Sequence, residues 1–176
     1  VAAWNGSADM ENRNAALAIF TGQAAMGSQI HGAYKREAAL AALKTTASQL
    51  KAATGRIDPK WSEVSRVLRG SKSWPTDGGP DTLRAMYAAG DLAKDKFRSG
   101  RAGDVYVAMA DWAPDGTYRI DTIHQYGSAT LDASSPHYDD QSPIFAEKKW
   151  KQPPMTLAGV LAEATRDYRP GKDPVK

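Results

Sequence analysis

The fold class is decided by the stretch Asp104-Val105-Tyr106-Val107-Ala108-Met109-Ala110-Asp111-Trp112, followed by Pro114-Asp115-Gly116 and by residues 118–126. Apolar side chains alternate from Val105 to Met109, which places them on one face of a strand. The Pro-Asp-Gly sequence is typical of a turn, and Tyr118 to Tyr126 continues as a second strand. Together these segments predict a β-hairpin.

Upstream of the hairpin, the sequence predicts helices over residues 1–70. Ser7 and Asp9 are suitable caps for a first helix, whose apolar side comprises Leu17, Phe20, Ala24 and Met26. We expect a break near Gly27 to Gly32, because glycine weakens a helix. These helices are expected to pack, since nothing on them has a spacing that chemistry requires.

Two further helices follow the expected break. The second has one apolar face and Gly55 as its stop; this face comprises Leu40, Leu43, Ala47 and Leu50. The third begins with Asp58 as its cap and Pro59 at its first position. It is expected to continue to Gly70, with a face formed by Trp61, Val64 and Leu68.

Residues 71–130 are predicted to be strand-rich and residues 131–176 to form a loop and a C-terminal helix. Residues 74–81 have turn composition, and Thr82 to Tyr87 fit a short helix or a strand, of which we favour the strand. The last helix, Thr156 to Tyr168, directs four apolar residues inward, namely Leu157, Val160, Leu161 and Ala164. The sequence therefore predicts an α+β fold in a single segment, 1–176, without a boundary between two domains.

Composition excludes several classes of protein. The chain has 176 residues, 41% hydrophobic and 24% charged, as is usual for globular proteins, and no apolar run approaches the roughly 20 residues of a spanning helix. Its net charge of +3 is dispersed, so we expect neither nucleic acid nor a membrane as a partner. The absence of cysteine excludes thiol nucleophiles and Cys-based zinc sites.

The first residues also indicate how the chain is made. Val1 is not Met, and the residues after it lack the basic start and apolar stretch of a signal peptide. We therefore expect a fragment or a processing product of a longer protein.

Few residues have a pattern that chemistry requires. The three histidines are His31, His124 and His137, and none has the His-x-x-x-His or His-x-His spacing of a zinc site. His137 with Asp139 and Asp140 admits two interpretations, a cation site or a hydrogen-bonded loop, and we favour the loop because calcium takes six or more ligands.

Asp111 has a special position in the predicted strand. It continues the apolar face of Val105 to Met109, so its carboxylate points toward the core if the register holds. A buried carboxylate needs a partner, and a carboxylate that orients a histidine is a common arrangement. In the alternative interpretation, which the residues alone favour, the strand ends at Ala110 and Asp111 opens the turn.

Several segments together resemble the C-terminal region of the β subunit of the penicillin acylase family. That family includes penicillin, cephalosporin and aculeacin acylases and acyl-homoserine-lactone acylases. The most specific feature is Tyr126-Gly127-Ser128 followed by Ser135-Pro136-His137-Tyr138-Asp139-Asp140-Gln141. The usual Gln between Gly127 and Ser128 is absent. The remaining features are Trp4-Asn5-Gly6, Trp61 to Gly70, Gly78 to Ala85, Gly103-Asp104 and Trp150-Lys151.

The resemblance implies an N-terminal-nucleophile hydrolase with an αββα sandwich, produced by self-cleavage. Its N-terminal Ser attacks an amide carbonyl through an acyl-enzyme. Substrates would be acylated β-lactams, lipopeptides or acyl-homoserine lactones, and the location would be periplasmic or secreted. The nucleophile, the oxyanion Asn and the calcium ligands lie upstream in the family, so this segment is expected to hold no catalytic residue, cofactor or metal.

Within this resemblance the chain has limited roles. Asp111 becomes a candidate for an acid that supports the histidine beside the nucleophile, and His137, Tyr138, Asp140 and Gln141 are interpreted as structural. The expected partners are the remaining acylase chains of the same precursor and a small acyl amide. The alternative is a non-catalytic module that binds a partner or ligand.

Overall fold

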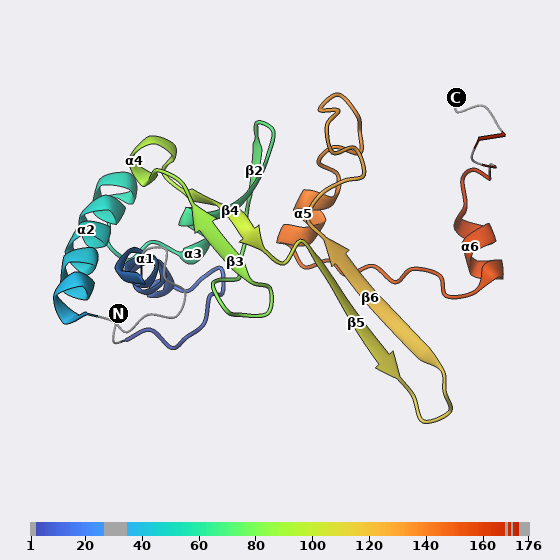
Figure 1. Cartoon of the computed structure of the whole chain (residues 1–176), viewed down its shortest axis with the longest axis horizontal. Helices are drawn as coiled ribbons and strands as arrows, with labels where there is room; N and C mark the ends of the chain where they lie inside the picture. The colour runs from blue at the N-terminus through green and yellow to red at the C-terminus, as the bar shows by residue number, and fades with distance from the viewer. Residues whose placement is uncertain (1–2, 27–34, 168, 170, 173–176) are drawn as a thin grey trace. The chain divides into compact units, whose positions relative to one another are not determined.

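The computed structural model describes residues 3–26, 35–167, 169 and 171–172, and it divides the chain into two compact units. The first unit contains Val1–Val107 and Ile123–Lys149, and the second contains Ala108–Thr122 and Trp150–Lys176. The architecture is mixed: helices come first, strands follow, and a short helix ends the chain, as the sequence predicted (Figure 1).

Helices α1 (Ala15–Met26) and α2 (Arg36–Thr54) pack against each other in the first unit. Asn12, not Ser7 or Asp9, caps α1, since its side-chain oxygen accepts the backbone N–H groups of residues 14 and 15. Gly55 ends α2 in the left-handed conformation, as predicted. The predicted break near Gly27 to Gly32 lies outside the described residues.

The core of the first unit is centred on Phe20 and Trp61, whose rings lie 5.3 Å apart and are both fully buried. The Trp61 indole N–H also donates to the carbonyl of Gly78 at 2.8 Å. From the predicted face of α2, Leu50 is buried, whereas Leu40 is 49% exposed. The predicted helical faces therefore contribute to the core only in part.

The predicted third helix is wrong in its start and in its end: it begins at Trp61 with Lys60, not Asp58, at the N-cap position, and it lasts one turn. Helix α3 (Trp61–Val64) is followed directly by strand β1 (Ser65–Arg69), which turns at Gly70 into the antiparallel strand β2 (Lys72–Pro75). Helical spacing of the apolar residues suggested a helix, but pairing with β2 and β4 determines the conformation.

Strands β1 and β2 belong to a four-stranded sheet with the order β2-β1-β4-β3. Strand β3 is Met86–Ala89, β4 is Arg98–Gly103, and the one-turn helix α4 (Leu92–Asp95) connects them. Only the β1–β4 pair is parallel among the described strands of this sheet. The strand favoured for Thr82 to Tyr87 thus begins only at Met86.

The predicted hairpin is confirmed as strands β5 (Tyr106–Trp112) and β6 (Tyr118–His124), which form a separate two-stranded sheet. Its turn is closed by the N–H of Ala113 to the carbonyl of Thr117 at 2.8 Å, and by Gly116 N–H to Ala113 at 3.0 Å. Strand β5 continues past Ala110, so the interpretation in which Asp111 opens the turn is wrong.

Two helices follow the hairpin. Helix α5 (Gln141–Ala146) belongs to the first unit, where it packs against β1 and β2 and buries Phe145. Helix α6 (Leu157–Glu163) belongs to the second unit and is capped by the Thr156 hydroxyl. Its predicted inward residues are all exposed. Within the described part of the chain, no helix has the length and apolar character needed to cross a membrane.

Candidate functional site

The site with the most specific sequence is the signature loop, residues 134–141. The His137 Nδ1 atom lies 3.0 Å from a carboxylate oxygen of Asp140, and the His137 backbone N–H donates to the Ser135 hydroxyl at 3.2 Å. Desolvation raises the pKa of Asp140, but hydrogen bonds from His137 and Gln141 outweigh it and hold that pKa below its usual range. The loop is therefore closed by its own polar groups.

Gly127 explains why the signature includes a glycine before the loop. A Cβ atom at this position would lie 1.8 Å from the His137 carbonyl oxygen and 2.5 Å from an Asp140 carboxylate oxygen. No larger residue fits that space. Nearby, the N–H of Ala129 donates to the same His137 carbonyl at 3.1 Å. The segment that begins with Tyr126-Gly127-Ser128 and the signature loop therefore contact each other through their backbones.

Arg69, at the end of β1, fastens this loop to the four-stranded sheet. Its guanidinium donates to the carbonyls of Tyr138 at 3.0 Å, Thr130 at 2.9 Å and Ala129 at 3.4 Å. It also lies 3.8 Å from the centre of the Tyr138 ring and 5.2 Å from that of Tyr126. A planar guanidinium holds its five N–H donors in a fixed fork, which suits several carbonyls at set positions better than the three rotatable donors of an ammonium.

A hollow of about 310 Å³ lies between the β1–β2 turn and the signature loop. Lys72 and Asp139 form an ion pair there, with 2.5 Å between the ammonium nitrogen and the carboxylate. Two of its three serines are engaged: Ser134 donates to Asp132 at 2.6 Å, and Ser135 accepts the His137 amide. Neither hydroxyl is bonded to an imidazole, so neither is activated as a nucleophile in the manner of a Ser–His pair.

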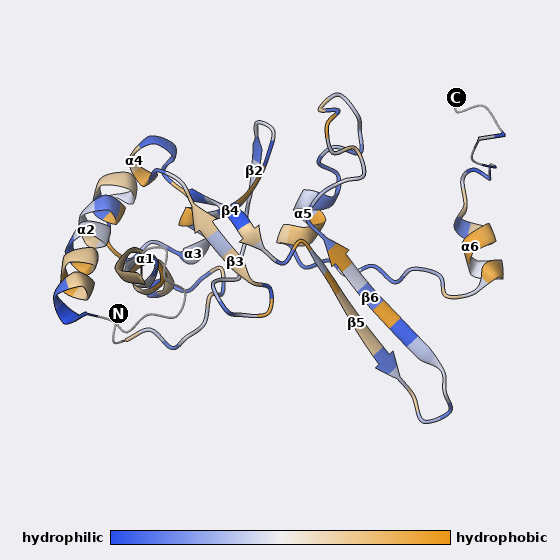
Figure 2. Cartoon of the chain, viewed as in Figure 1, coloured by the Kyte–Doolittle hydropathy of each residue, from blue (hydrophilic) through white to orange (hydrophobic). Residues whose placement is uncertain are grey.

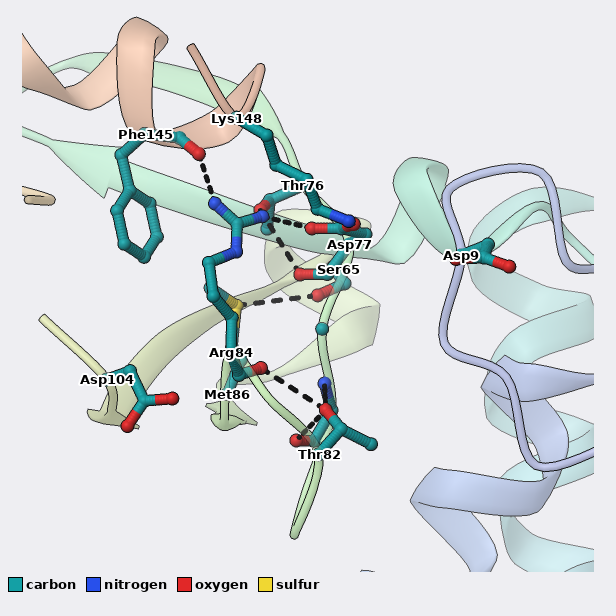
Figure 3. Close-up of polar contacts among 12 residues, drawn as sticks. Asp9, Ser65, Thr76, Asp77, Thr82, Arg84, Met86, Asp104, Phe145 and Lys148 are labelled. Carbon is teal, nitrogen blue, oxygen red and sulfur yellow. Dashed lines mark hydrogen bonds and ion pairs between the residues drawn. The ribbon is translucent and has the colours of Figure 1, made fainter. Parts of the chain in front are cut away.

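A second polar cluster surrounds the buried Arg84, which is 4% exposed. Its guanidinium pairs with Asp77, donates to the Phe145 carbonyl and to Thr76, and lies over the Phe145 ring; Lys148 also pairs with Asp77 (Figure 3). These contacts join the loop before β3 to helix α5. The Arg84 cluster is thus a structural ion-pair network.

Hydrogen bonds to the backbone hold the segment from Gly78 to Ala85 in place. The Thr82 hydroxyl donates to the carbonyl of Gly79 at 2.9 Å and accepts the Gly79 N–H at 3.1 Å (Figure 3). The Asp104 carboxylate accepts the Ala85 N–H at 2.7 Å, which accounts for the Gly103-Asp104 motif at the end of β4. Since the Gly79 amide already has a partner, this loop does not present it to a phosphate.

Of the candidates from the sequence, the structure brings His137 and Asp140 together. Asp111 lies on β5, where its side chain is exposed, and His31 lies outside the described residues. Within the ranges that the structure describes, no three His, Asp or Glu side chains converge as metal ligands. The sequence analysis did not predict that Arg69 and Arg84 hold these clusters together, although both residues lie within the motifs that resemble the family.

Comparisons with known proteins agree with these motifs. A family described as penicillin amidase matches residues 2–162. Acyl-homoserine lactone acylase PvdQ of Pseudomonas fluorescens is 27% identical over 132 residues, which are 74% of this chain and 17% of that protein. The chain therefore spans only about a sixth of the length of the relative that it matches.

Proposed function

Because the chain belongs to the penicillin amidase family, we propose that it is the C-terminal part of an acylase that hydrolyses an amide bond. The observation that carries the proposal is the family match, which extends over residues 2–162 and thus over nearly the whole chain. The named relative is itself an acylase. Family and relative together indicate an acylase-type hydrolase.

In this proposal the chemistry is performed by a nucleophile outside these 176 residues. An N-terminal Ser, exposed by self-cleavage of a precursor, attacks the amide carbonyl with its own α-amino group as the base. The amine leaves, and water then hydrolyses the acyl-enzyme. The small share of the relative that aligns, 17%, supports this division because most of such an acylase lies beyond the matched segment.

The role proposed for this chain is to complete an αββα scaffold. The contacts of Arg69 with the signature loop and those of the Arg84 cluster support that role, because they join segments that are distant in the sequence. Asp111 is proposed as a positioning residue that orients the histidine beside the nucleophile. In this proposal, any structural calcium is held by residues outside this chain, as the family resemblance implies.

The substrate proposed is an acyl amide: an acylated β-lactam, a lipopeptide or an acyl-homoserine lactone. The relative is an acyl-homoserine lactone acylase, which favours the last of these. The remaining chains of the same precursor are the proposed partners, and the proposed location is the periplasm or the medium.

The test is to assay the 176-residue chain and the product of the whole coding region on acyl-homoserine lactones and on acylated β-lactams. We expect the whole acylase to release the acyl group and the chain alone to be inactive. The matched control is the whole acylase with its N-terminal nucleophile replaced by Ala. Hydrolysis by the 176 residues alone would overturn the assignment of chemistry to another segment.

Asp111 has its own test in the whole acylase. The variant Asp111→Asn should lower kcat and move the pH dependence of kcat, while KM changes little, because the carboxylate would act through the histidine. An unchanged pH profile would remove Asp111 from the machinery.

A further inference from the structure

The second unit, residues 108–122 and 150–176, lacks a core of its own. None of its residues that the structure describes is buried. By contrast, the first unit buries large side chains such as Trp61, Phe20 and Phe145. A segment of this size cannot offset the entropy of ordering its backbone without buried apolar surface. The second unit therefore requires cover by residues outside it.

The middle of strand β5 is coloured as hydrophobic in Figure 2. All residues of this strand are exposed except Val107, which is half-buried. Tyr106 is 59% exposed and Trp112 is 67% exposed on one face, and Met109 is 42% exposed on the other. An isolated two-stranded hairpin is only marginally stable in water. Both faces of β5, and not one alone, need cover.

Four backbone hydrogen bonds determine which edge of β5 is open. The N–H groups of Ala113 and Gln125 donate to the carbonyls of Thr117 and Val105, so odd-numbered residues of β5 pair with β6. The even-numbered Thr122 of β6 bonds outward, to Lys151, in both directions. The same alternation makes the even-numbered residues of β5 direct their N–H and C=O groups away from β6; they are Tyr106, Ala108, Ala110 and Trp112.

The two outer edges of the hairpin therefore differ. Residues 150–152 cover the β6 edge, where the Gln152 amide also donates to Asp121 at 2.8 Å. The β5 edge has none of the devices that protect exposed strands: β5 contains no Pro, no Lys and no Arg, and Asp111 is its single charged residue. An unprotected apolar edge of seven residues is typical of an inner strand of a larger sheet.

We propose that the open edge of β5 pairs with a strand from the remainder of the acylase polypeptide, which also covers both faces of β5. This inference rests on the proposed function, since the occupant comes from the part of an acylase that lies outside the match to this chain. A second copy of the chain is a poorer occupant. Edge-to-edge pairing of two β5 strands would satisfy the amides and leave the faces with Tyr106, Met109 and Trp112 in water.

The direct test is residue-resolved amide hydrogen exchange of the whole acylase and of the 176-residue chain. We expect the outward amides of Ala108 and Ala110 to exchange at least about 100-fold more slowly in the whole acylase than in the chain. The inward amides of Met109 and Asp111 should differ less, because β6 already accepts them. Equal and rapid exchange of Ala108 and Ala110 in both proteins would overturn the proposal.

Two substitutions of Ala110 distinguish the loss of its outward N–H from the effect of changing its side chain. Ala110→Pro removes the outward N–H without removing a bond to β6, whereas Ala110→Ser keeps that N–H. The proline variant of the whole acylase should lose assembly, measured as the yield of soluble processed enzyme, by at least about tenfold, and the serine variant should not. Equal yields of the two variants would show that no strand pairs there.

The outcomes also distinguish the two levels of the argument. If the acylase is active and its Ala108 and Ala110 amides exchange rapidly, the proposed function stands and the proposed edge pairing is wrong. If these amides exchange slowly in a whole protein that has no acylase activity, the edge pairing stands and the proposed function is wrong. Protection that appears in the 176-residue chain alone and rises with its concentration would identify a second copy as the occupant and overturn the proposal.

Discussion

Arg69 is the residue whose replacement tests most directly how the signature loop is held. The variant Arg69→Met keeps the volume and apolar stem of the side chain and removes its charge and all its donors. Two of the three bonds to carbonyls are short, at 3.0 Å to Tyr138 and 2.9 Å to Thr130, and the third is long at 3.4 Å. The two short bonds carry most of the expected effect.

The magnitude follows from these contacts. A charge-assisted hydrogen bond contributes about 1.5–3 kcal/mol, and the lower figure applies because Arg69 is only half-buried. The Tyr138 ring at 3.8 Å adds about 0.5 kcal/mol. Arg69→Met should therefore destabilise the closed loop by about 3.5 kcal/mol. Arg69→Lys keeps the charge and one bond, so it should cost about 1.5 kcal/mol.

The assay is amide hydrogen exchange of Ala129 and Tyr138, whose N–H groups donate within the loop to His137 and Ser135 at 3.1 Å each. At about 1.4 kcal/mol per factor of ten, Arg69→Met should accelerate their exchange about 300-fold and Arg69→Lys about tenfold. The control Arg101→Met, at an exposed position of β4, should change the rates by less than about threefold. Exchange in Arg69→Met within threefold of the parent would refute the reasoning.

Three further predictions concern the same unit. Gly127→Ala should lower the thermal midpoint by several degrees, because its Cβ meets the His137 carbonyl; an unchanged midpoint in calorimetry would mean that the loop yields. Arg84→Met should cost about 3 kcal/mol in urea unfolding, since it leaves buried Asp77 without its buried partner; Arg84→Lys should recover part of that loss. Because the pKa of Asp140 is lowered in the folded protein, its carboxylate stabilises the fold above the ordinary carboxylate pKa. That stabilisation disappears as pH falls through the lower pKa of the folded state. Asp140→Asn should therefore reduce the loss of stability on acidification, and identical pH profiles of unfolding would count against it.

The parts of the fold that could be predicted from the sequence are those specified by local pattern. Gly55 ends a helix because of its own conformational freedom, and the hairpin follows from the alternation of β5 and the Pro-Asp-Gly turn. The strand β1 could not be predicted in this way. Trp61, Val64 and Leu68 have helical spacing, and only pairing with β2 and β4 selects the extended conformation.

The organisation of the signature loop depends on contacts that are distant in the sequence. Arg69 bonds carbonyls that lie 60 to 69 residues further along the chain, and no local pattern announces such a pairing. The clash that requires Gly127 likewise arises from His137, ten positions away. The loop could be identified as structural from its residues, but its central arginine could not.

The apolar residues of β5 and α6 show a different kind of mismatch between pattern and structure. Leu157, Val160 and Leu161 have the spacing of a packed helical face, yet their exposures are 75%, 47% and 59%. A helical face in this pattern is expected to be buried, and the second unit contributes nothing that buries it. The same is true of Tyr106 and Trp112 on β5. The exposed apolar residues of β5 and α6 therefore form the surfaces at which we expect the rest of the proposed acylase to bind.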